Sequence, residues 1–126
     1  MTVDLFNDNA KDSSRSLQCY LVLIGYAARR QTITYSELAK KLGYKKRATG
    51  TGIMDDRLAA LMSWCKHNDL PALTSLVVRE DTGVPGPGIQ MNRSEVPTAH
   101  AKAYAFDWYA IFPPTVAQLE KAVRSR

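Results

Sequence analysis

A short helix with both ends marked, residues 34–43 (TYSELAKKLG), constrains the fold of this chain most. Thr34 and Glu37 have the Thr-x-x-Glu spacing of a capping box, in which two side chains satisfy free backbone amides at a helix start. Gly43 follows the last apolar position and is typical of a helix that ends in a left-handed residue. With its leucines facing inward, the stretch predicts a two-turn helix.

Two longer apolar helices are predicted on either side of this short helix. Residues 16–29 carry apolar side chains around most of a helical circumference, so this helix should lie in the middle of the core. Residues 31–35 (QTITY) are a β-prone connector. Residues 54–65 place apolar side chains at i, i+4, i+7, i+8 and i+11, an amphipathic stripe that the following HNDLP ends.

The next segment predicts a β-hairpin. Residues 74–80 (TSLVVRE) are a predicted strand, the glycines and prolines of residues 81–88 (DTGVPGPG) predict a tight loop, and residues 89–92 (IQMN) are a predicted return strand. The predicted order of elements is therefore helix, short strand, helix, helix, strand, loop and strand. This is the element order of a winged helix. Such a domain is a helix-turn-helix with a β-hairpin on its flank.

The last third combines helix formers with five aromatic side chains. The pattern does not decide between helix and strand for AYAFDWY, and we interpret the aromatics as core rather than as a stacking platform. Thr115 and Gln118 form a second capping box. The predicted fold class is α/β, mainly α: a polar N-terminal arm (1–15), then one winged helix-turn-helix-like domain (16–126) with a small β-hairpin wing and an added C-terminal helix.

Ten residues at the inward positions of these elements are predicted to be mostly buried. They are Leu21, Ile24, Leu38, Leu42, Leu58, Leu61, Met62, Leu76, Val78 and Trp108.

The positive charge of the chain lies in one segment. Residues 29–47 hold seven Lys and Arg residues against Glu37 alone, which gives this segment a net charge of +6 and the remainder −1. Such a patch attracts polyanions, because each neutralised phosphate releases condensed counterions. The alternative is a solvated helix face, which most charge runs are.

One region, about residues 32–88, contains the stretch ITYSELAKKLG, the helix after it, and LP followed by SLVVREDTGVPGPG. This region resembles the DNA-binding winged-helix domain of the alkylguanine-DNA alkyltransferases and their alkyltransferase-like relatives. Those proteins carry a Thr-Tyr-Gly-Glu-Leu-Ala type helix, a glycine-bearing turn, a second helix and a Val-Val strand that leads into a glycine-containing loop. The resemblance implies binding to DNA.

The enzymes of that family hold their acceptor cysteine in Pro-Cys-His-Arg before the Val-Val strand. Here residues 71–76 read PALTSL, without the nucleophile or the His-Arg pair, so the resemblance implies no dealkylation. It matches Tyr35 with the tyrosine that presses on the target phosphate. The intercalating arginine falls on Thr49, with Arg47 two residues away.

The predicted nucleic-acid-binding residues combine this match with the basic segment and the wing. They are Tyr35, Lys40, Lys41, Lys45, Lys46, Arg47, Thr49 and Arg79. For Tyr35 the alternative is a residue packed against the capped helix. The predicted partner is a nucleic acid, with duplex DNA as the first choice.

Asp55 and Asp56 are unfavourable for contacts between the third predicted helix and DNA bases. They lie near the predicted start of the third helix, whose N-terminal residues contact base edges in a standard helix-turn-helix. Carboxylates there would repel phosphates. This leaves open the alternative of a protein-interaction module, such as an inhibitor, immunity or accessory protein, on a winged-helix scaffold.

No catalytic or metal-binding motif stands out in the sequence. Cys19 and Cys65 lie in apolar patterns and are interpreted as small core residues. Cys65 and His67 are two positions apart on a helix and point in different directions, so they cannot easily share a proton. We therefore expect a protein that is not an enzyme and needs no metal or other cofactor.

The hydropathy pattern predicts a cytoplasmic protein without a membrane partner. No apolar run approaches the roughly 18 residues of a membrane span, and the polar N-terminus has no apolar signal-peptide core.

Overall fold

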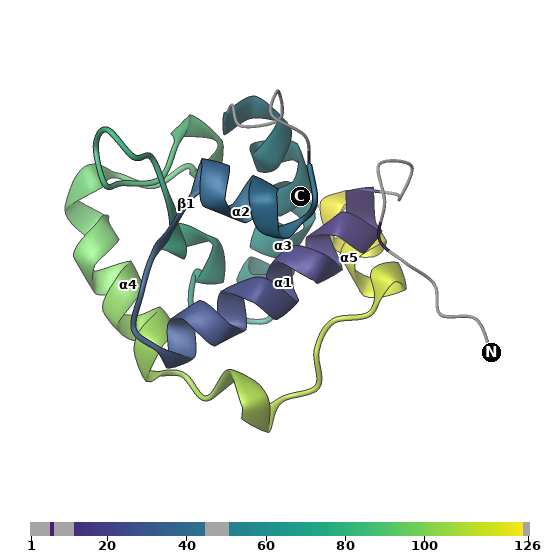
Figure 1. Ribbon diagram of the computed structural model, residues 1–126. Helices are drawn as coiled ribbons and strands as arrows, with labels where there is room; N and C mark the ends of the chain where they lie inside the picture. The colour runs from purple at the N-terminus through teal and green to yellow at the C-terminus, as the bar shows by residue number, and fades with distance from the viewer. Residues whose placement is uncertain (1–5, 7–11, 45–50, 125–126) are drawn as a thin grey trace.

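The chain is mainly helical, with one small two-stranded sheet. The computed structural model describes residue 6 and residues 12–44 and 51–124, with the backbone alone for 51–53. Figure 1 shows α1 (Asp12–Ala28) crossing the front, α3 (Thr51–His67) behind it, and α4 (Val96–Ala105) and α5 (Val116–Arg124) at opposite ends. Because α1 contacts each of the other α-helices in the described chain, it occupies the middle of the fold, as its apolar circumference predicts.

Helix α1 begins at Asp12, four residues earlier than predicted. Residues 12–15, which we assigned to a polar arm, are therefore helical. Ser13 donates a hydrogen bond to Oε1 of Glu120 in α5 at 3.1 Å, and Arg15 is 1% exposed. Polar residues begin this helix because their side chains bind other elements, which the apolar pattern could not indicate.

The short helix α2 (Tyr35–Lys41) has the predicted cap by Thr34 and the predicted glycine after its end, while the carboxylate of Glu37 meets the Thr34 hydroxyl. The hydroxyl of Thr34 accepts from the amide of Glu37 at 3.2 Å and lies 3.0 Å from Oε1 of the same glutamate. After Leu42, Gly43 adopts a φ of 80°, the left-handed conformation that glycine takes without strain. The predicted two-turn helix is confirmed.

The sheet differs from the prediction. Strand β1 (Ile33–Thr34) pairs in parallel with β2 (Val77–Val78), so β2 is not the first strand of a hairpin. Beyond β2, the amide of Arg79 binds the carbonyl of Val84 at 2.8 Å and closes a tight loop. A 3₁₀ helix, η3 (Pro87–Ile89), then occupies the start of the predicted return strand.

The predicted β-hairpin wing is therefore wrong for residues 74–92, all of which the structure describes. Pro85 and Pro87 lack the amides that a ladder needs, and Gln90 is left-handed with a φ of 47°. Ile89 is 4% exposed and lies against α3 instead of extending along β2.

The buried core agrees with most of the predicted positions. The confirmed residues are Ile24, Leu38, Leu42, Leu58, Leu61, Leu76, Val78 and Trp108. Met62 is half-buried, and Leu21 is 49% exposed, so its prediction was wrong. Leu21 lies about 100° around α1 from Tyr20, outside the stripe that Tyr20, Ile24 and Ala27 bury.

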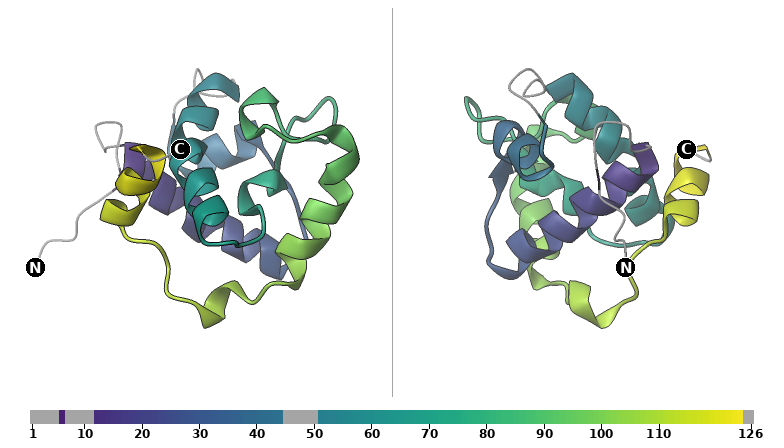
Figure 2. Two further views of the ribbon diagram at one scale, coloured as in Figure 1. Left: turned by 180° about the vertical axis from the view of Figure 1, so that it is seen from behind. Right: turned by 45° about the vertical axis from the view of Figure 1, so that its right-hand side comes forward.

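The aromatic segment is only partly core. Trp108 is buried, donates from Nε1 to the carbonyl of Ala103 at 2.8 Å, and meets Tyr20 edge to face. After α4 the chain leaves helical structure, passes η5 (Trp108–Ala110) and crosses the outside of the molecule to α5 (Figure 2). Along that connection Tyr109 is 67% and Phe112 94% exposed, so these two aromatics are not core residues.

The predicted opening of α5 is confirmed. The amide of Thr115 donates to Oε1 of Gln118 at 2.9 Å, and the amide of Gln118 donates to the Thr115 hydroxyl at 3.1 Å. Leu119 and Ala122 then lie in the core.

Candidate nucleic-acid interface

Two parts of the basic segment meet at the ring of Tyr26. Arg29 directly follows α1, and its guanidinium carbon lies 4.6 Å from the centroid of the Tyr26 ring. Lys41, in the last turn of α2, places its Nζ 5.8 Å from the same centroid. We call Tyr26, Arg29 and Lys41 the Tyr26 cluster. Both cations are exposed and Tyr26 is half-buried, so the cluster presents its charge to solvent.

Four of the predicted binding residues, Lys45, Lys46, Arg47 and Thr49, lie outside the described residues. Lys40 and Lys41 are both exposed on α2, as predicted for phosphate contacts. Tyr26 was not predicted, although its spacing of three residues from Arg29 places the two on one helical face. Its contact with Lys41 arises from the packing of α1 against α2 and had no local signal.

Tyr44, the last described residue before residues 45–50, is held by several contacts. Its amide binds the carbonyl of Ala39 at 3.0 Å, and its hydroxyl accepts from Nε of Arg57 at 2.8 Å. The guanidinium of Arg15 lies 4.5 Å from the ring centroid of Tyr44 and donates to the carbonyl of Leu42 at 2.6 Å. Two arginines from α1 and α3 therefore hold the end of the turn after α2.

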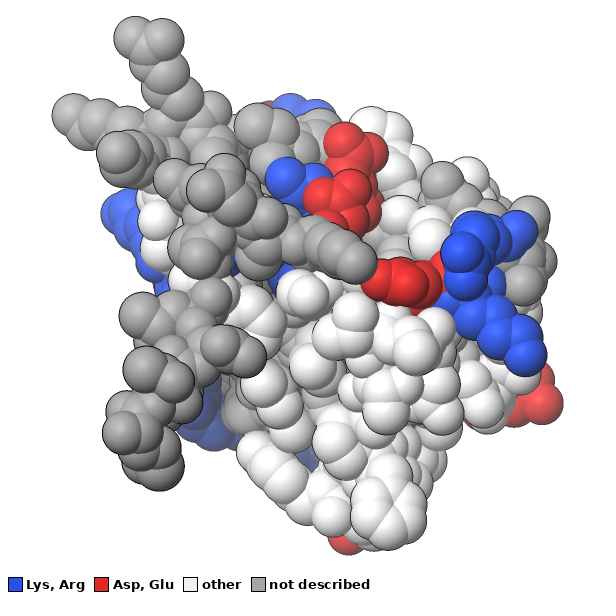
Figure 3. All heavy atoms as spheres, turned by 90° about the vertical axis from the view of Figure 1, so that its right-hand side faces the viewer, with Lys and Arg blue, Asp and Glu red and all other residues white. Residues whose placement is uncertain are grey.

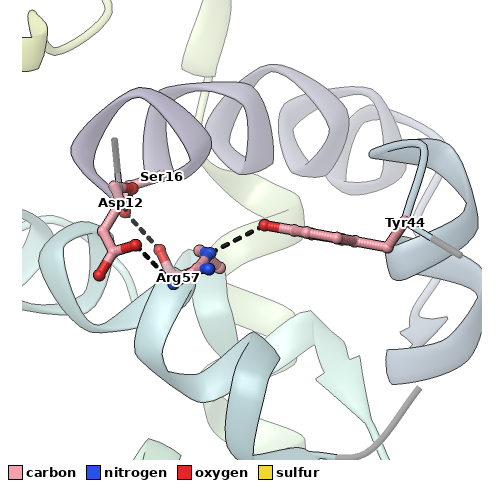
Figure 4. A network of polar contacts seen from close by, with 4 residues as sticks. All are labelled: Asp12, Ser16, Tyr44 and Arg57. Atoms are coloured by element: carbon pink, nitrogen blue, oxygen red, sulfur yellow. Dashed lines mark hydrogen bonds and ion pairs between the residues drawn. The ribbon is translucent and has the colours of Figure 1, made fainter. Parts of the chain in front are cut away.

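Arg57 connects three elements. Figure 4 shows its side chain between Asp12, which it meets at 2.5 Å, and Tyr44, while Ser16 donates to the backbone carbonyl of Arg57. Burial opposes the charge of Arg57, but the hydrogen bond to Tyr44 and the negative charge of Asp12 outweigh it and raise the pKa of Arg57.

Arg57→Ala is expected to lower the free energy of unfolding by about 1–2 kcal/mol, because the side chain loses hydrogen bonds to two partners and is only partly exposed to water. Urea denaturation followed by tryptophan fluorescence measures this change. Arg124→Ala, a control at an exposed position of α5, is expected to change the free energy by less than about 0.5 kcal/mol. Equal effects of the two substitutions would contradict the role given to Arg57.

Tyr35 is placed differently from the prediction. It is 3% exposed, so it cannot press on a phosphate at the surface. Its hydroxyl donates to Oδ1 of Asp55 at 3.0 Å and accepts from the amide of Gly86 at 2.9 Å. Burial, together with the negative charge of Asp55, raises the pKa of Tyr35. Tyr35 therefore lies in the interior, where it connects α2 to Asp55 of α3 and to the loop at Gly86.

The position of Asp55 removes part of the predicted conflict with DNA. Helix α3 begins at Thr51, so Asp55 and Asp56 follow its first turn. Asp55 is half-buried and binds Tyr35, and burial raises its pKa despite the hydrogen bonds from Tyr35 and Gly88. A Cβ at position 88 would lie 2.4 Å from Cγ of Asp55, so the loop lies tightly against this carboxylate. Only Asp56 is exposed to solvent.

Arg79 is exposed but already paired. Its Nε and Nη2 donate to the two carboxylate oxygens of Asp81 at 3.0 and 2.9 Å. The hydrogen bonds from Arg79 lower the pKa of Asp81, so the carboxylate stays charged. A phosphate contact by Arg79 would require this ion pair to separate.

The thiols do not resemble activated nucleophiles. Cys19 and Cys65 are free, 0% and 2% exposed, and burial raises the pKa of each to about 12. Both are small core residues, as predicted. Within residues 12–44 and 51–124 no group of three or more His, Cys, Asp or Glu side chains is arranged to hold a metal ion.

No protein-family model matches the chain, and it matches no curated protein and no solved structure. In the described part of the chain, none of the helices has the length and apolar character needed to cross a membrane. The fold and the surface define the class of protein: it is mainly helical and has an exposed cluster of cations around a tyrosine.

Proposed function

We propose that this protein binds nucleic acid through its phosphate backbone, at the surface centred on the Tyr26 cluster. The observation that carries this proposal is that Arg29, directly after α1, and Lys41, in α2, meet at one exposed site. Long cationic side chains that converge in this way suit phosphate contacts, which position a protein on a duplex without reading its sequence.

The Lys and Arg side chains of this surface have different neighbours from those on the face drawn in Figure 3. On the face drawn in Figure 3, several Lys and Arg side chains lie beside Asp and Glu side chains, so that their fields partly cancel. Around the Tyr26 cluster the basic segment holds a single acidic residue, Glu37, whose carboxylate is engaged by the hydroxyl of Thr34. This favours the cluster as the site of polyanion binding.

The described side chains of helix α3, residues 54–67, do not support base reading. Of residues 54–67, only Asp56, Lys66 and His67 are exposed, because α1, α5 and the 3₁₀ segments cover the remainder. A recognition helix needs one free face to lie in a major groove. The elements α1, β1, α2 and α3 follow one another in the predicted order. We nevertheless propose binding without sequence specificity and without insertion of α3 into a groove.

One face of the Tyr26 ring is covered by Arg29 and is not free to stack on a base. This favours contacts to phosphates over the base stacking used by many single-strand binders. Duplex DNA therefore remains the first choice of partner. The resemblance to a dealkylating family without its acceptor cysteine is consistent with a protein that binds DNA and performs no chemistry on it.

Removing the two charges of the cluster is expected to weaken binding and its dependence on salt. For the double variant Arg29→Gln, Lys41→Gln, the slope of log affinity against log salt should become shallower by about 1.8, since each phosphate contact on B-DNA contributes about 0.9. Fluorescence anisotropy with a labelled duplex measures the slope.

The matched control is the double variant Lys66→Gln, Lys121→Gln, which removes the same charge from exposed positions on α3 and α5. It should leave the slope within about 0.5 of the wild-type value. If both double variants change the slope equally, binding depends on net charge alone and the proposed site is wrong.

Binding of a protein partner is the second candidate, and the exposed aromatics favour it. Phe112 is 94% and Tyr109 67% exposed on the connection between α4 and α5. Large contiguous apolar patches on a surface are typical of interaction sites. The lower part of the face in Figure 3 is a broad surface with few charged side chains. This candidate replaces the first if no nucleic acid binds.

A further inference from the structure

A hollow of about 780 Å³ lies beside the C-terminal half of α3, away from the Tyr26 cluster. We call it the α3 hollow. Its wall includes the apolar side chains of Met62, Cys65 and Ile89, and its volume lies within the usual range for sites that bind small organic molecules. The function proposed above uses none of these residues.

Lys66 is the charged side chain among the described residues that line the α3 hollow. Lys66 and His67 are exposed at its edge, and no Asp or Glu belongs to the described residues that line it. A ligand with a negative charge would therefore meet Lys66 without facing a carboxylate. An apolar wall with a cation at its edge is complementary to an amphipathic anion.

The negative pole of α3 does not cancel this charge. A helix C-terminus exposes carbonyl oxygens that would repel an anion. Here the carbonyls of Trp64, Cys65 and Lys66 accept hydrogen bonds from the following residues, with distances of 2.9 Å from Leu70 to Cys65 and 3.3 Å from Asp69 to Lys66. The pole of a helix amounts to about half an elementary charge, so the full positive charge of Lys66 exceeds it at this edge.

The wall of the hollow also contains a buried hydroxyl. Thr74 is 1% exposed, and its Oγ1 has no hydrogen-bond partner among the described residues. Leaving a buried polar group without a partner is unfavourable, so a polar atom that entered the hollow beside Thr74 would relieve that cost. The site thus offers an apolar wall, a cation at the edge and a hydroxyl in need of a partner.

We propose that the α3 hollow binds a small organic anion that has an apolar body, such as an aromatic sulfonate or carboxylate. The apolar body lies against Met62, Cys65 and Ile89, and the acidic group lies toward Lys66. The proposal is independent of nucleic-acid binding, since the two surfaces share no residue.

The test compares two fluorescent probes that differ by one charged group. 1-Anilinonaphthalene-8-sulfonate carries an aromatic body and a sulfonate, and N-phenyl-1-naphthylamine has the same body without the charge. The folded protein should bind the sulfonate at a single saturable site and about two- to fivefold more tightly than the neutral probe, as expected for one partly exposed charge contact. Equal affinities, or no saturation, would overturn the proposal.

Two single-charge reversals separate this site from the Tyr26 cluster. Lys66→Glu should weaken sulfonate binding about five- to tenfold and leave duplex binding unchanged, whereas Lys41→Glu should weaken duplex binding and leave the probe unaffected. Both lysines are exposed, so both variants should fold. Loss of probe binding in the Lys41 variant with no loss in the Lys66 variant would contradict the assignment.

The location of the probe is read from methyl NMR signals. The sulfonate should shift the methyl resonances of Met62 and Ile89, which face the hollow. Shifts confined to the aromatic signals of Tyr109 and Phe112 would place the probe on the exposed connection before α5 and overturn the proposal.

Discussion

Leu61→Ala is expected to lower the free energy of unfolding by about 2–5 kcal/mol, the range for truncation of a fully buried leucine. Leu61 is 0% exposed and lies on α3, the helix that packs against both α1 and α5. The substitution leaves a cavity between three helices, and a cavity among rigid helices collapses only partly. Urea denaturation followed by circular dichroism measures the change.

The matched control is Leu21→Ala on α1, the same substitution at a leucine that is 49% exposed. Its expected effect is below about 1 kcal/mol, since less apolar surface returns to water. If Leu21→Ala destabilised the protein as much as Leu61→Ala, the assignment of the buried faces of α1 and α3 would be wrong.

Gly88→Ala is expected to destabilise the protein by about 1–3 kcal/mol, because the added methyl group overlaps a packed neighbour. The new Cβ would lie 2.4 Å from Cγ and 2.7 Å from Cβ of Asp55, and the latter atom cannot move without the backbone of α3. The loss should also free the loop from Tyr35 and Asp55. Thermal and urea denaturation both report this change.

Gly25→Ala is the matched glycine substitution. The nearest atom to its new Cβ is Nη1 of Arg29 at 3.8 Å, so the methyl group fits. Within a helix it should stabilise the protein by about 0.5–1 kcal/mol, the difference between the helix propensities of alanine and glycine. Opposite signs for the two glycines are the expected result. The same sign for both would contradict the tight packing of Gly88 on Asp55.

The features that the sequence predicted correctly obey local rules. The caps at Thr34 and Thr115 depend on residues three positions apart, and the helix end at Gly43 depends only on the φ of that glycine. The apolar stripe of α3 follows from helical periodicity. Each of these signals lies within a few residues, and so could be read without knowledge of the tertiary structure.

The features that were missed depend on contacts between distant segments. Parallel pairing of β1 with β2 joins Ile33 to Val77, and a hairpin pattern cannot distinguish this from an antiparallel return. Burial of Tyr35 depends on the amide of Gly86, and burial of Arg15 on the carbonyl of Leu42. In each case a polar group is satisfied across the fold, where hydrophobic periodicity carries no signal.

The candidate site was predictable in its charge but not in its geometry. The composition of residues 29–47 indicated polyanion binding, and Lys40 and Lys41 are exposed as expected. Tyr35 belongs to the interior and Arg79 to an ion pair with Asp81, because both depend on where the loop after β2 lies. Tyr26 joins the site because α1 packs against α2.

The central claim, binding to the phosphate backbone without sequence specificity, is tested most directly by a salt titration of the wild-type protein on two duplexes of unrelated sequence. Log affinity should fall linearly with log salt, with the same slope for both duplexes and about −0.9 for each phosphate contacted. Contact by Arg29, Lys41 and further cations of residues 29–47 predicts a slope steeper than about −2. No binding to either duplex at about 50 mM salt, where screening is weak, or an affinity that does not change with salt, would contradict the claim.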